Sequence, residues 1–235
     1  MEFTYEAYRG LIRLLKACDY VFTDYHQYDR YPRCVIMRHD IDEDLEQATR
    51  LAEVEAQEGI KSTYFVLLKT DFYYPASAGS IKAIKKILSL GHEIGLHFDE
   101  VAYPDECGEI AQRIRQEADI LSRICGVEIT TVSMHRPSKA TLEADAQIPG
   151  IINSYGKTFF HEFKYLSDSR CHWREPVLDI VRSGEFDRLH ILTHAFWYHE
   201  ESMSISEALR EFISAANQTR YKMLAENIRD IESIL

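Results

Sequence analysis

Apolar and polar residues follow two distinct rhythms along this chain. In four segments apolar side chains recur every three or four residues, the spacing that places them on one face of an α-helix. These segments are 3–15, 44–57, 81–90 and 109–125. Short apolar runs lie between and after them, at 34–37, 62–68, 93–96, 130–134, 165–166 and 189–193. Continuous runs of this length are typical of strands buried on both faces, so the pattern predicts helices and buried strands in alternation.

This alternation predicts an α/β fold, because strands separated by helices pair in parallel through right-handed crossovers. No linker or repeat interrupts the chain, so we expect a single domain over 1–235 that begins with a helical segment, 1–30. Periodicity does not distinguish an open sheet from a closed barrel. In both arrangements ligands bind at the carboxyl ends of the parallel strands, so the polar residues that follow each strand are the candidates for function.

The composition is that of an ordinary globular protein. Of its 235 residues 46% are hydrophobic, and 27 Lys and Arg stand against 38 Asp and Glu, for a net charge of −11. The acidic balance argues against a nucleic-acid partner, which requires clustered Lys and Arg. The apolar runs are far shorter than the ~20 residues of a membrane-spanning helix, so membrane insertion is not expected. The first residues do not resemble a signal peptide, and the five cysteines are widely spaced, which favours free thiols and a cytoplasmic location.

The first predicted strand runs into Arg38-His39-Asp40-Ile41-Asp42. Alternate residues of an extended chain point to the same side, so the carboxylates of Asp40 and Asp42 converge. Two carboxylates beside an imidazole suit a divalent-metal site or a general base next to a metal ligand. The alternative is structural, since Asp42 or Asp44 could cap the helix that follows. That role leaves His39 and Asp40 unexplained.

The later strands also end in charged or titratable side chains. In chain order these are His97, His135, Arg136, Asp168 and His194. A single histidine near a core is more often hydrogen-bonded for structural reasons, but the shared position of these residues favours one common site. Trp173 and Trp197 adjoin two of these strand ends, and we expect their rings to contact a substrate there.

Together these motifs resemble those of the polysaccharide deacetylase family, the metal-dependent carbohydrate esterases. The most specific match is Gly91-His92-Glu93-Ile94-Gly95-Leu96-His97, which is similar to the Gly-His-Glu-Ile-Gly-Asn-His of that family. Arg38-His39-Asp40-Ile41-Asp42 stands where the family has Thr-Phe-Asp-Asp-Gly. Weaker resemblances to its later motifs are found at 135–137, 167–174 and 192–194. The likeness extends from about Val35 to Trp197 and favours a divergent branch associated with bacterial surface-polysaccharide biosynthesis.

The resemblance implies a distorted (β/α) barrel of parallel strands and a hydrolytic reaction on a C–N bond. It implies that Asp40 is the general base and His194 the general acid. In such a site Arg136 is expected to orient Asp40 and balance its charge, and Asp168 is expected to do the same for His194.

The resemblance also implies a divalent metal, with zinc expected and cobalt or nickel as alternatives. Asp42 and His97 are the expected ligands. The second histidine of the family would fall on Val101, whose side chain cannot coordinate a metal. A third ligand must therefore come from elsewhere, and His135 and Asp99 are the nearest options.

The function implied is that of a metal-dependent deacetylase whose partner is an acylated sugar or glycan precursor, in O-antigen or capsule biosynthesis. One alternative is an amidohydrolase that acts on another small C–N bond, because fold alone does not select the substrate. Another is a catalytically silent barrel that binds a glycan or a partner enzyme. Val101 favours this alternative, because it stands where the family has a metal ligand. The tyrosine-rich stretch 20–31 forms either a lid or packing beneath the barrel.

Overall fold

The structure is a computed structural model that describes residues 1–103 and 110–234. The strands in this part of the chain are β1 (Val21–Thr23), β2 (Cys34–Ile41), β3 (Thr63–Leu67), β4 (Glu93–Asp99), β5 (Thr131–His135), β6 (Ile152–Asn153), β7 (Lys164–Ser167) and β8 (Arg188–Thr193). The α-helices are α1 (Tyr5–Ala17), α2 (Leu45–Gln57), α3 (Ala78–Ser89), α4 (Ile110–Cys125), α5 (Lys139–Ala144), α6 (Val177–Ser183), α7 (Ile205–Asn227) and α8 (Ile231–Ile234). The short helical turns are η1 (Tyr28–Arg30), η2 (Glu100–Ala102), η3 (Thr158–Glu162) and η4 (Ala195–Trp197).

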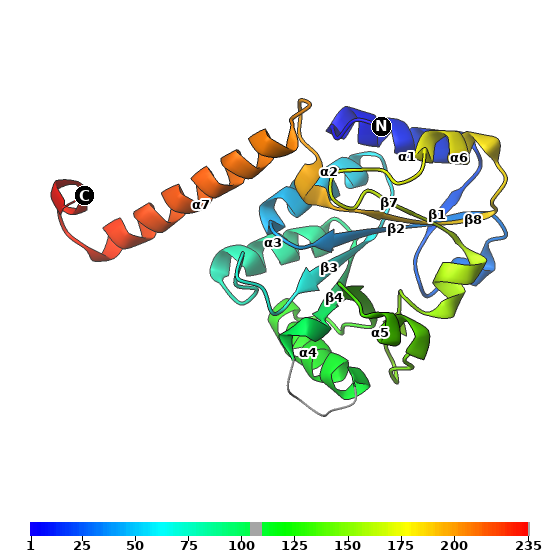
Figure 1. Ribbon diagram of the computed structural model, residues 1–235, viewed down its shortest axis with the longest axis horizontal. Coiled ribbons are helices and arrows are strands. Elements are labelled where there is room, and N and C mark those ends of the chain that lie inside the picture. Colours follow the sequence, from blue (N-terminus) through cyan, green and yellow to red (C-terminus); the bar gives the residue numbers. More distant parts are fainter. Residues whose placement is uncertain (104–109, 235) are drawn as a thin grey trace.

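The strands form one parallel sheet in the order β6-β5-β4-β3-β2-β8-β7, with β1 paired to the start of β2 (Figure 1). β6 and β7 are the two ends of this path, and no strand pair joins them in the described residues. The sheet is therefore a curled half-barrel. The α/β fold with parallel strands in a distorted barrel, which the sequence predicts, is confirmed.

The two faces of the sheet pack against different partners. Val35 and Met37 of β2 belong to the main core, together with apolar residues of the surrounding helices. Cys34 and Ile36 alternate with them and face the concave side, where they form a second cluster with Phe65 and other aromatic residues. Both faces of β2 are buried along its whole length, as the continuous apolar run predicts.

The helix after β2 is capped by Asp44 rather than by Asp42. The Asp44 carboxylate accepts hydrogen bonds from the backbone N–H groups of Glu46, at 2.7 Å, and Gln47, at 3.2 Å. These are among the N–H groups that the start of a helix leaves without a partner. Because Asp44 takes this role, Asp42 is free to act elsewhere.

His39 faces the helices, away from the concave side of the sheet. Its Nε2 lies 2.9 Å from the Glu55 carboxylate, which also accepts hydrogen bonds from the hydroxyls of Tyr8, at 2.7 Å, and Tyr64, at 2.8 Å. All four side chains are fully buried. This polar cluster ties α1 and α2 to the sheet, because a buried carboxylate is stable only where donors surround it. His39 therefore has a structural role.

The first thirty residues are only partly helical, which corrects the prediction of a helical segment over 1–30. α1 is followed by the strand β1, and Tyr25 then enters the concave side with 1% exposure. The Tyr25 ring contacts Phe159 and Phe65 in the cluster that contains Cys34, at the start of β2. This end of the barrel is opposite to the carboxyl ends of the strands. The stretch 20–31 thus packs beneath the barrel and does not form a lid.

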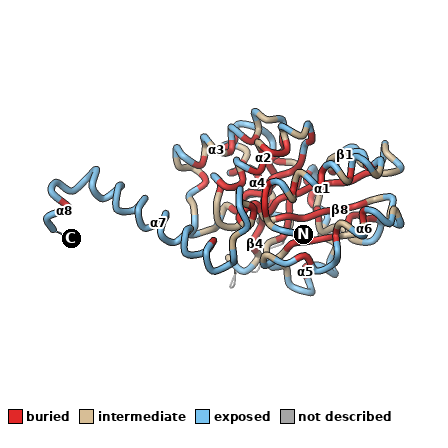
Figure 2. The backbone as a smooth tube through the Cα atoms, turned by 90° about the horizontal axis from the view of Figure 1, so that it is seen from above, coloured by how far each residue is buried: buried red, intermediate tan, exposed pale blue. Residues whose placement is uncertain are grey.

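The C-terminal helix α7 leaves the body of the protein (Figures 1 and 2). Only Ala208 among its residues is buried, although Phe212 near its start contacts Phe72 and Phe196.

In the described residues no helix combines the length and apolar composition that crossing a bilayer requires. Cys18, Cys34, Cys125 and Cys171 are free thiols. Cys107 and the predicted first residue of the helix at 109–125 lie outside the described residues.

Candidate active site

The carboxyl ends of four strands surround a pocket with a volume of about 330 Å3. The residues that line it from these ends are Asp40, Asp42, His97, His135 and His194. Adjacent parallel strands present their carboxyl ends at one edge of the sheet, so residues far apart in sequence share one cavity. The structure thus brings together the predicted base Asp40, the predicted acid His194 and the predicted ligands Asp42, His97 and His135, whereas the alternative ligand Asp99 does not line the pocket. Those roles stay predictions.

Three of these side chains form a compact triangle of potential metal ligands. Asp42 Oδ1 lies 3.1 Å from His97 Nε2 and 3.2 Å from His135 Nδ1, and the two histidine nitrogens are 3.1 Å apart. Ligands placed tetrahedrally around Zn2+ at about 2.0–2.1 Å are roughly 3.3 Å from one another. The spacing and the N, N, O donor set therefore fit a divalent cation.

The protonation of His97 supports the same assignment. Its Nδ1 lies 3.3 Å from the Ser133 carbonyl oxygen, which can only accept, so Nδ1 carries the proton. In the neutral ring Nε2 then presents a lone pair to the triangle, as in many histidine metal ligands. Asp42 Oδ1 is buried and has no hydrogen bond in the described residues. A cation would satisfy this oxygen and the lone pair together.

Charge also prepares Asp42 for a cation. Burial alone would raise the pKa of its carboxyl group, but the close imidazole groups of His135 and His97 and the charge of His194 hold that pKa well below its usual value. Asp42 is therefore a carboxylate at neutral pH, the form that binds metal.

The third position of the triangle belongs to His135 and not to Asp99. The Asp99 carboxylate accepts a hydrogen bond from the Val101 N–H at 3.1 Å and pairs with Arg136 at 2.5 Å. Val101 itself is 58% exposed on η2. Position 101 carries valine, so the second imidazole comes from His135 at the end of β5. The donor set then contains one carboxylate and two imidazoles.

Asp40 lies directly below the triangle, with its Oδ2 atom 3.8 Å from His97 Nε2. This carboxylate is 4% exposed and accepts hydrogen bonds from Arg38 Nη2 at 2.9 Å and from the Ser133 hydroxyl at 3.2 Å. The Arg38 guanidinium is fully buried and also donates to the Ser154 hydroxyl at 2.7 Å. Two donors, Arg38 on β2 and Ser133 on β5, therefore fix the orientation of Asp40 beside the predicted metal.

Arg136 does not orient Asp40, which corrects the sequence-based expectation. Its side chain is 64% exposed and pairs with Asp99. Arg38 provides the positive charge instead, two residues before Asp40 on the same face of β2. A signal for it was present in the sequence, because an arginine inside a strand buried on both faces requires a carboxylate partner.

His194 also lines the pocket, and the buried Asp168 contacts it from outside the cavity. His194 Nδ1 lies 2.7 Å from Asp168 Oδ1, while Nε2 is directed toward Asp42, 3.9 Å away. Asp168 is fully buried and also accepts a hydrogen bond from the Tyr198 hydroxyl at 3.0 Å. Burial lowers the pKa of His194, but the hydrogen bond and charge of Asp168 outweigh it and raise that pKa to about 9. The contact expected between Asp168 and His194 is thus present.

The two tryptophans have different surroundings. Trp197 lines the pocket, as expected for a residue that contacts a substrate. Trp173 does not: it is 9% exposed and packs in the main hydrophobic core, which corrects its assignment to the site. Glu43 also lines the pocket, although the sequence analysis did not place it in the site. Burial and the adjacent Asp42 carboxylate raise the pKa of Glu43 to about 7.

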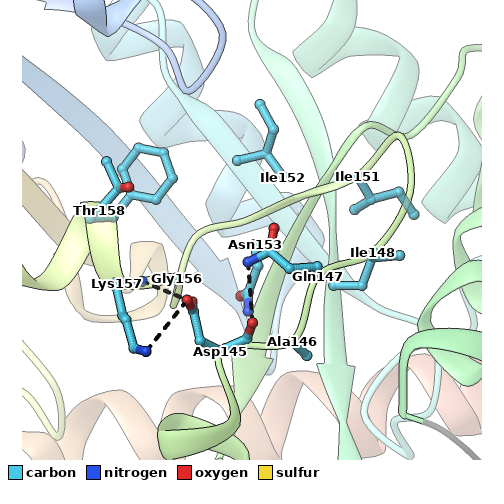
Figure 3. Close-up of a pocket in the computed structure, with 11 residues that line it drawn as sticks. Asp145, Ala146, Gln147, Ile148, Ile151, Ile152, Asn153, Gly156, Lys157 and Thr158 are labelled. Atoms are coloured by element: carbon cyan, nitrogen blue, oxygen red, sulfur yellow. Dashed lines mark hydrogen bonds and ion pairs between the residues drawn. The ribbon is translucent and has the colours of Figure 1, made fainter.

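A second cavity of about 240 Å3 lies beside β6 and η3 (Figure 3). Its charged groups satisfy each other: Asp145 accepts a hydrogen bond from the Lys157 N–H at 3.0 Å and lies 3.9 Å from the Lys157 ammonium group. The cluster of potential metal ligands found in the described residues is not part of this cavity. The pocket at the strand ends is therefore the better candidate for chemistry.

No family model matches the chain, and no curated protein matches its sequence. The fold is similar to a family 4 carbohydrate esterase from Bacillus anthracis, with 16% identity, 88% of this chain and 84% of that chain covered, and a TM-score of 0.46. It is also similar to a family 4 carbohydrate esterase from Streptomyces lividans in complex with acetate, with 13% identity, 69% of this chain and 79% of that chain covered, and a TM-score of 0.47. A third similar structure is BA3943, a CE4 family pseudoenzyme from Bacillus anthracis, with 16% identity, 80% of this chain and 62% of that chain covered, and a TM-score of 0.45. The chain thus spans less than two thirds of the length of BA3943.

Proposed function

We propose that this protein is a metal-dependent deacetylase that removes the acyl group from an N-acylated sugar. The observation that carries the proposal is the triangle of Asp42, His97 and His135, with Asp40 on one side and His194 on the other. This arrangement provides a cation site, a base and an acid within one pocket. Metal-dependent amide hydrolysis uses these three elements.

Asp42, His97 and His135 would hold the cation, for which we propose zinc. A divalent cation there would supply Lewis acidity, which makes water more acidic and an acyl carbonyl more electrophilic. Asp40 accepts the proton of the attacking water, because its carboxylate is oriented toward the triangle by Arg38 and Ser133. The base thus needs no rearrangement when the substrate arrives.

His194 donates a proton to the leaving nitrogen. An amine leaves readily only when its nitrogen is protonated, so the acid must be charged at the working pH. With a pKa raised to about 9, His194 is an imidazolium ion at neutral pH. Asp168 holds Nδ1, which leaves the Nε2 proton for the substrate.

Asp168→Asn tests this acid. His194 acts only while protonated, so activity falls as pH rises through its pKa, near 9. Removing the charge of Asp168 should lower that pKa and move the high-pH limb of kcat/KM downward by about one unit or more. Asp179→Asn, an exposed carboxylate on α6, is the control and should leave the limb in place. An unshifted limb in Asp168→Asn would exclude His194 as the acid.

The pocket also suggests a sugar-sized substrate. Its volume of about 330 Å3 is at the small end of ligand sites, and the Trp197 indole offers an apolar ring at its wall. We further propose that the sugar belongs to surface-polysaccharide biosynthesis in the cytoplasm. The support for this setting is the resemblance of Arg38-His39-Asp40-Ile41-Asp42, together with Gly95-Leu96-His97, to the divergent branch of the deacetylase family.

Acetate release from a panel of N-acetylated sugars tests the proposed function. We expect activity that a chelator abolishes and that added Zn2+ restores. Hydrolysis of another small amide but of no acylated sugar would favour the amidohydrolase instead. The silent barrel would predict no acetate release from any sugar; the donor set of Asp42, His97 and His135 supports the enzyme instead.

A further inference from the structure

Three arginines line the mouth of the pocket: Arg136 follows β5, and Arg170 and Arg174 follow β7. All three are exposed. They gather at one cavity in a protein whose net charge is −11. The mouth is therefore locally positive, which the overall composition does not predict.

Two of these arginines have no ionic partner in the described part of the chain. Arg136 pairs with Asp99, whereas Arg170 and Arg174 take part in no ion pair there. Nor are they needed to balance the deeper carboxylates. Asp40 pairs with Arg38, Asp42 lies against His97 and His135, and Asp168 pairs with His194. Two guanidinium groups thus face the pocket entrance with their charge available.

The backbone holds two of the three arginines, Arg136 and Arg170, in unusual conformations. Arg136 has φ of 51° and Arg170 has φ of 62°, and Cys171 beside it has φ of 55°. Side-chain-bearing residues rarely occupy this left-handed region. Such conformations persist where the surrounding fold imposes them, and they often mark functional loops.

We propose that Arg170 and Arg174 bind an anionic group of the substrate, a phosphate or a carboxylate on the acylated sugar. A guanidinium group donates two parallel hydrogen bonds to either anion. The acyl group would then reach Asp40 and the metal ligands while the charged end stays at the mouth. This inference rests on the proposed deacetylase function and adds the substrate class to it: an acidic acylated sugar rather than a neutral one.

The test compares matched substrates. N-acetylglucosamine 1-phosphate and the neutral 1-O-methyl N-acetylglucosaminide differ in charge at one position, and N-acetylglucosaminuronic acid provides the carboxylate. We expect kcat/KM for one of the acidic sugars to exceed that of the neutral sugar by about tenfold or more at low salt. Which acidic sugar is preferred identifies the anion.

Arg170→Gln and Arg174→Gln should each remove most of this preference. For the acidic sugar we expect kcat/KM to fall about tenfold, and for the neutral sugar to stay within about twofold. Arg182→Gln is the control, because it removes the same charge from the surface of α6 and should change neither value.

Equal cleavage of acidic and neutral sugars, or an equal loss on both in the arginine variants, would overturn the anion site while the deacetylase stands. Calorimetry with glucosamine 1-phosphate, which has no acyl group to lose, separates the two ideas. If no sugar is cleaved but this ligand binds and Arg174→Gln weakens it, the anion site stands and the deacetylase falls. Absence of both cleavage and binding would overturn both.

Discussion

Asp40→Asn should lower the turnover of an N-acetylated sugar by roughly 100-fold or more, with little change in substrate binding. Asparagine keeps the shape of the side chain and can still accept a hydrogen bond from Arg38, which lies 2.9 Å from the carboxylate. It cannot take a proton from water. The loss should therefore appear in kcat, measured by acetate release under saturating substrate.

Asp44→Asn is the matched control for this variant. It makes the same chemical change four residues away, at the cap of α2, and asparagine caps a helix as well as aspartate does. Its turnover should stay within about twofold of wild type. Wild-type turnover in Asp40→Asn would show that Asp40 is not the general base.

Arg38→Met should destabilise the protein and also reduce its activity. Arg38 is fully buried and Asp40 is 4% exposed, so removal of the guanidinium leaves a carboxylate in the interior without its cationic partner. Breaking a buried pair in this way costs about 3–5 kcal/mol. Urea unfolding should show a correspondingly lower free energy of unfolding, and turnover should fall because Asp40 loses its orientation.

Arg136→Met provides the comparison, since the sequence suggested this arginine for the same role. The Arg136 side chain is 64% exposed, so solvent weakens its pair with the buried Asp99, and Asp99 keeps the Val101 N–H as a donor. We therefore expect the free energy of unfolding to fall by about 1 kcal/mol, less than in Arg38→Met. Equal destabilisation by the two variants would contradict the assignment of Arg38 as the partner of Asp40.

The hydrophobic pattern predicted most of the fold, because buried strands and amphipathic helices each leave a local signature. β2 was predicted to end at Met37 but continues to Ile41, since Arg38 and Asp40 are polar residues that pair with each other on the concave face. β1 was missed because a strand of 3 residues carries too short a pattern. α7 was not assigned, and its exposure in the structure offers no buried apolar face for such a pattern to record.

The sequence predicted those site residues that lie at the carboxyl ends of strands. Position after a strand placed His97, His135 and His194 in one pocket. Pattern alone did not choose His135 over Asp99 as third ligand, because that choice depends on which neighbours each side chain meets in space. Trp173 shows the same limit: it adjoins a strand end in sequence, yet its indole turns into the core.

The most direct measurement is a titration of metal-free protein with Co2+, followed by the absorption bands of the bound ion. We expect the wild type and Asp99→Asn each to bind one equivalent of Co2+. In His135→Ala and in His97→Ala we expect an affinity lower by roughly 100-fold or more, since each removes one corner of the triangle. Absence of saturable binding in the wild type, or unchanged affinity in His135→Ala, would contradict the metal site on which the proposed chemistry depends.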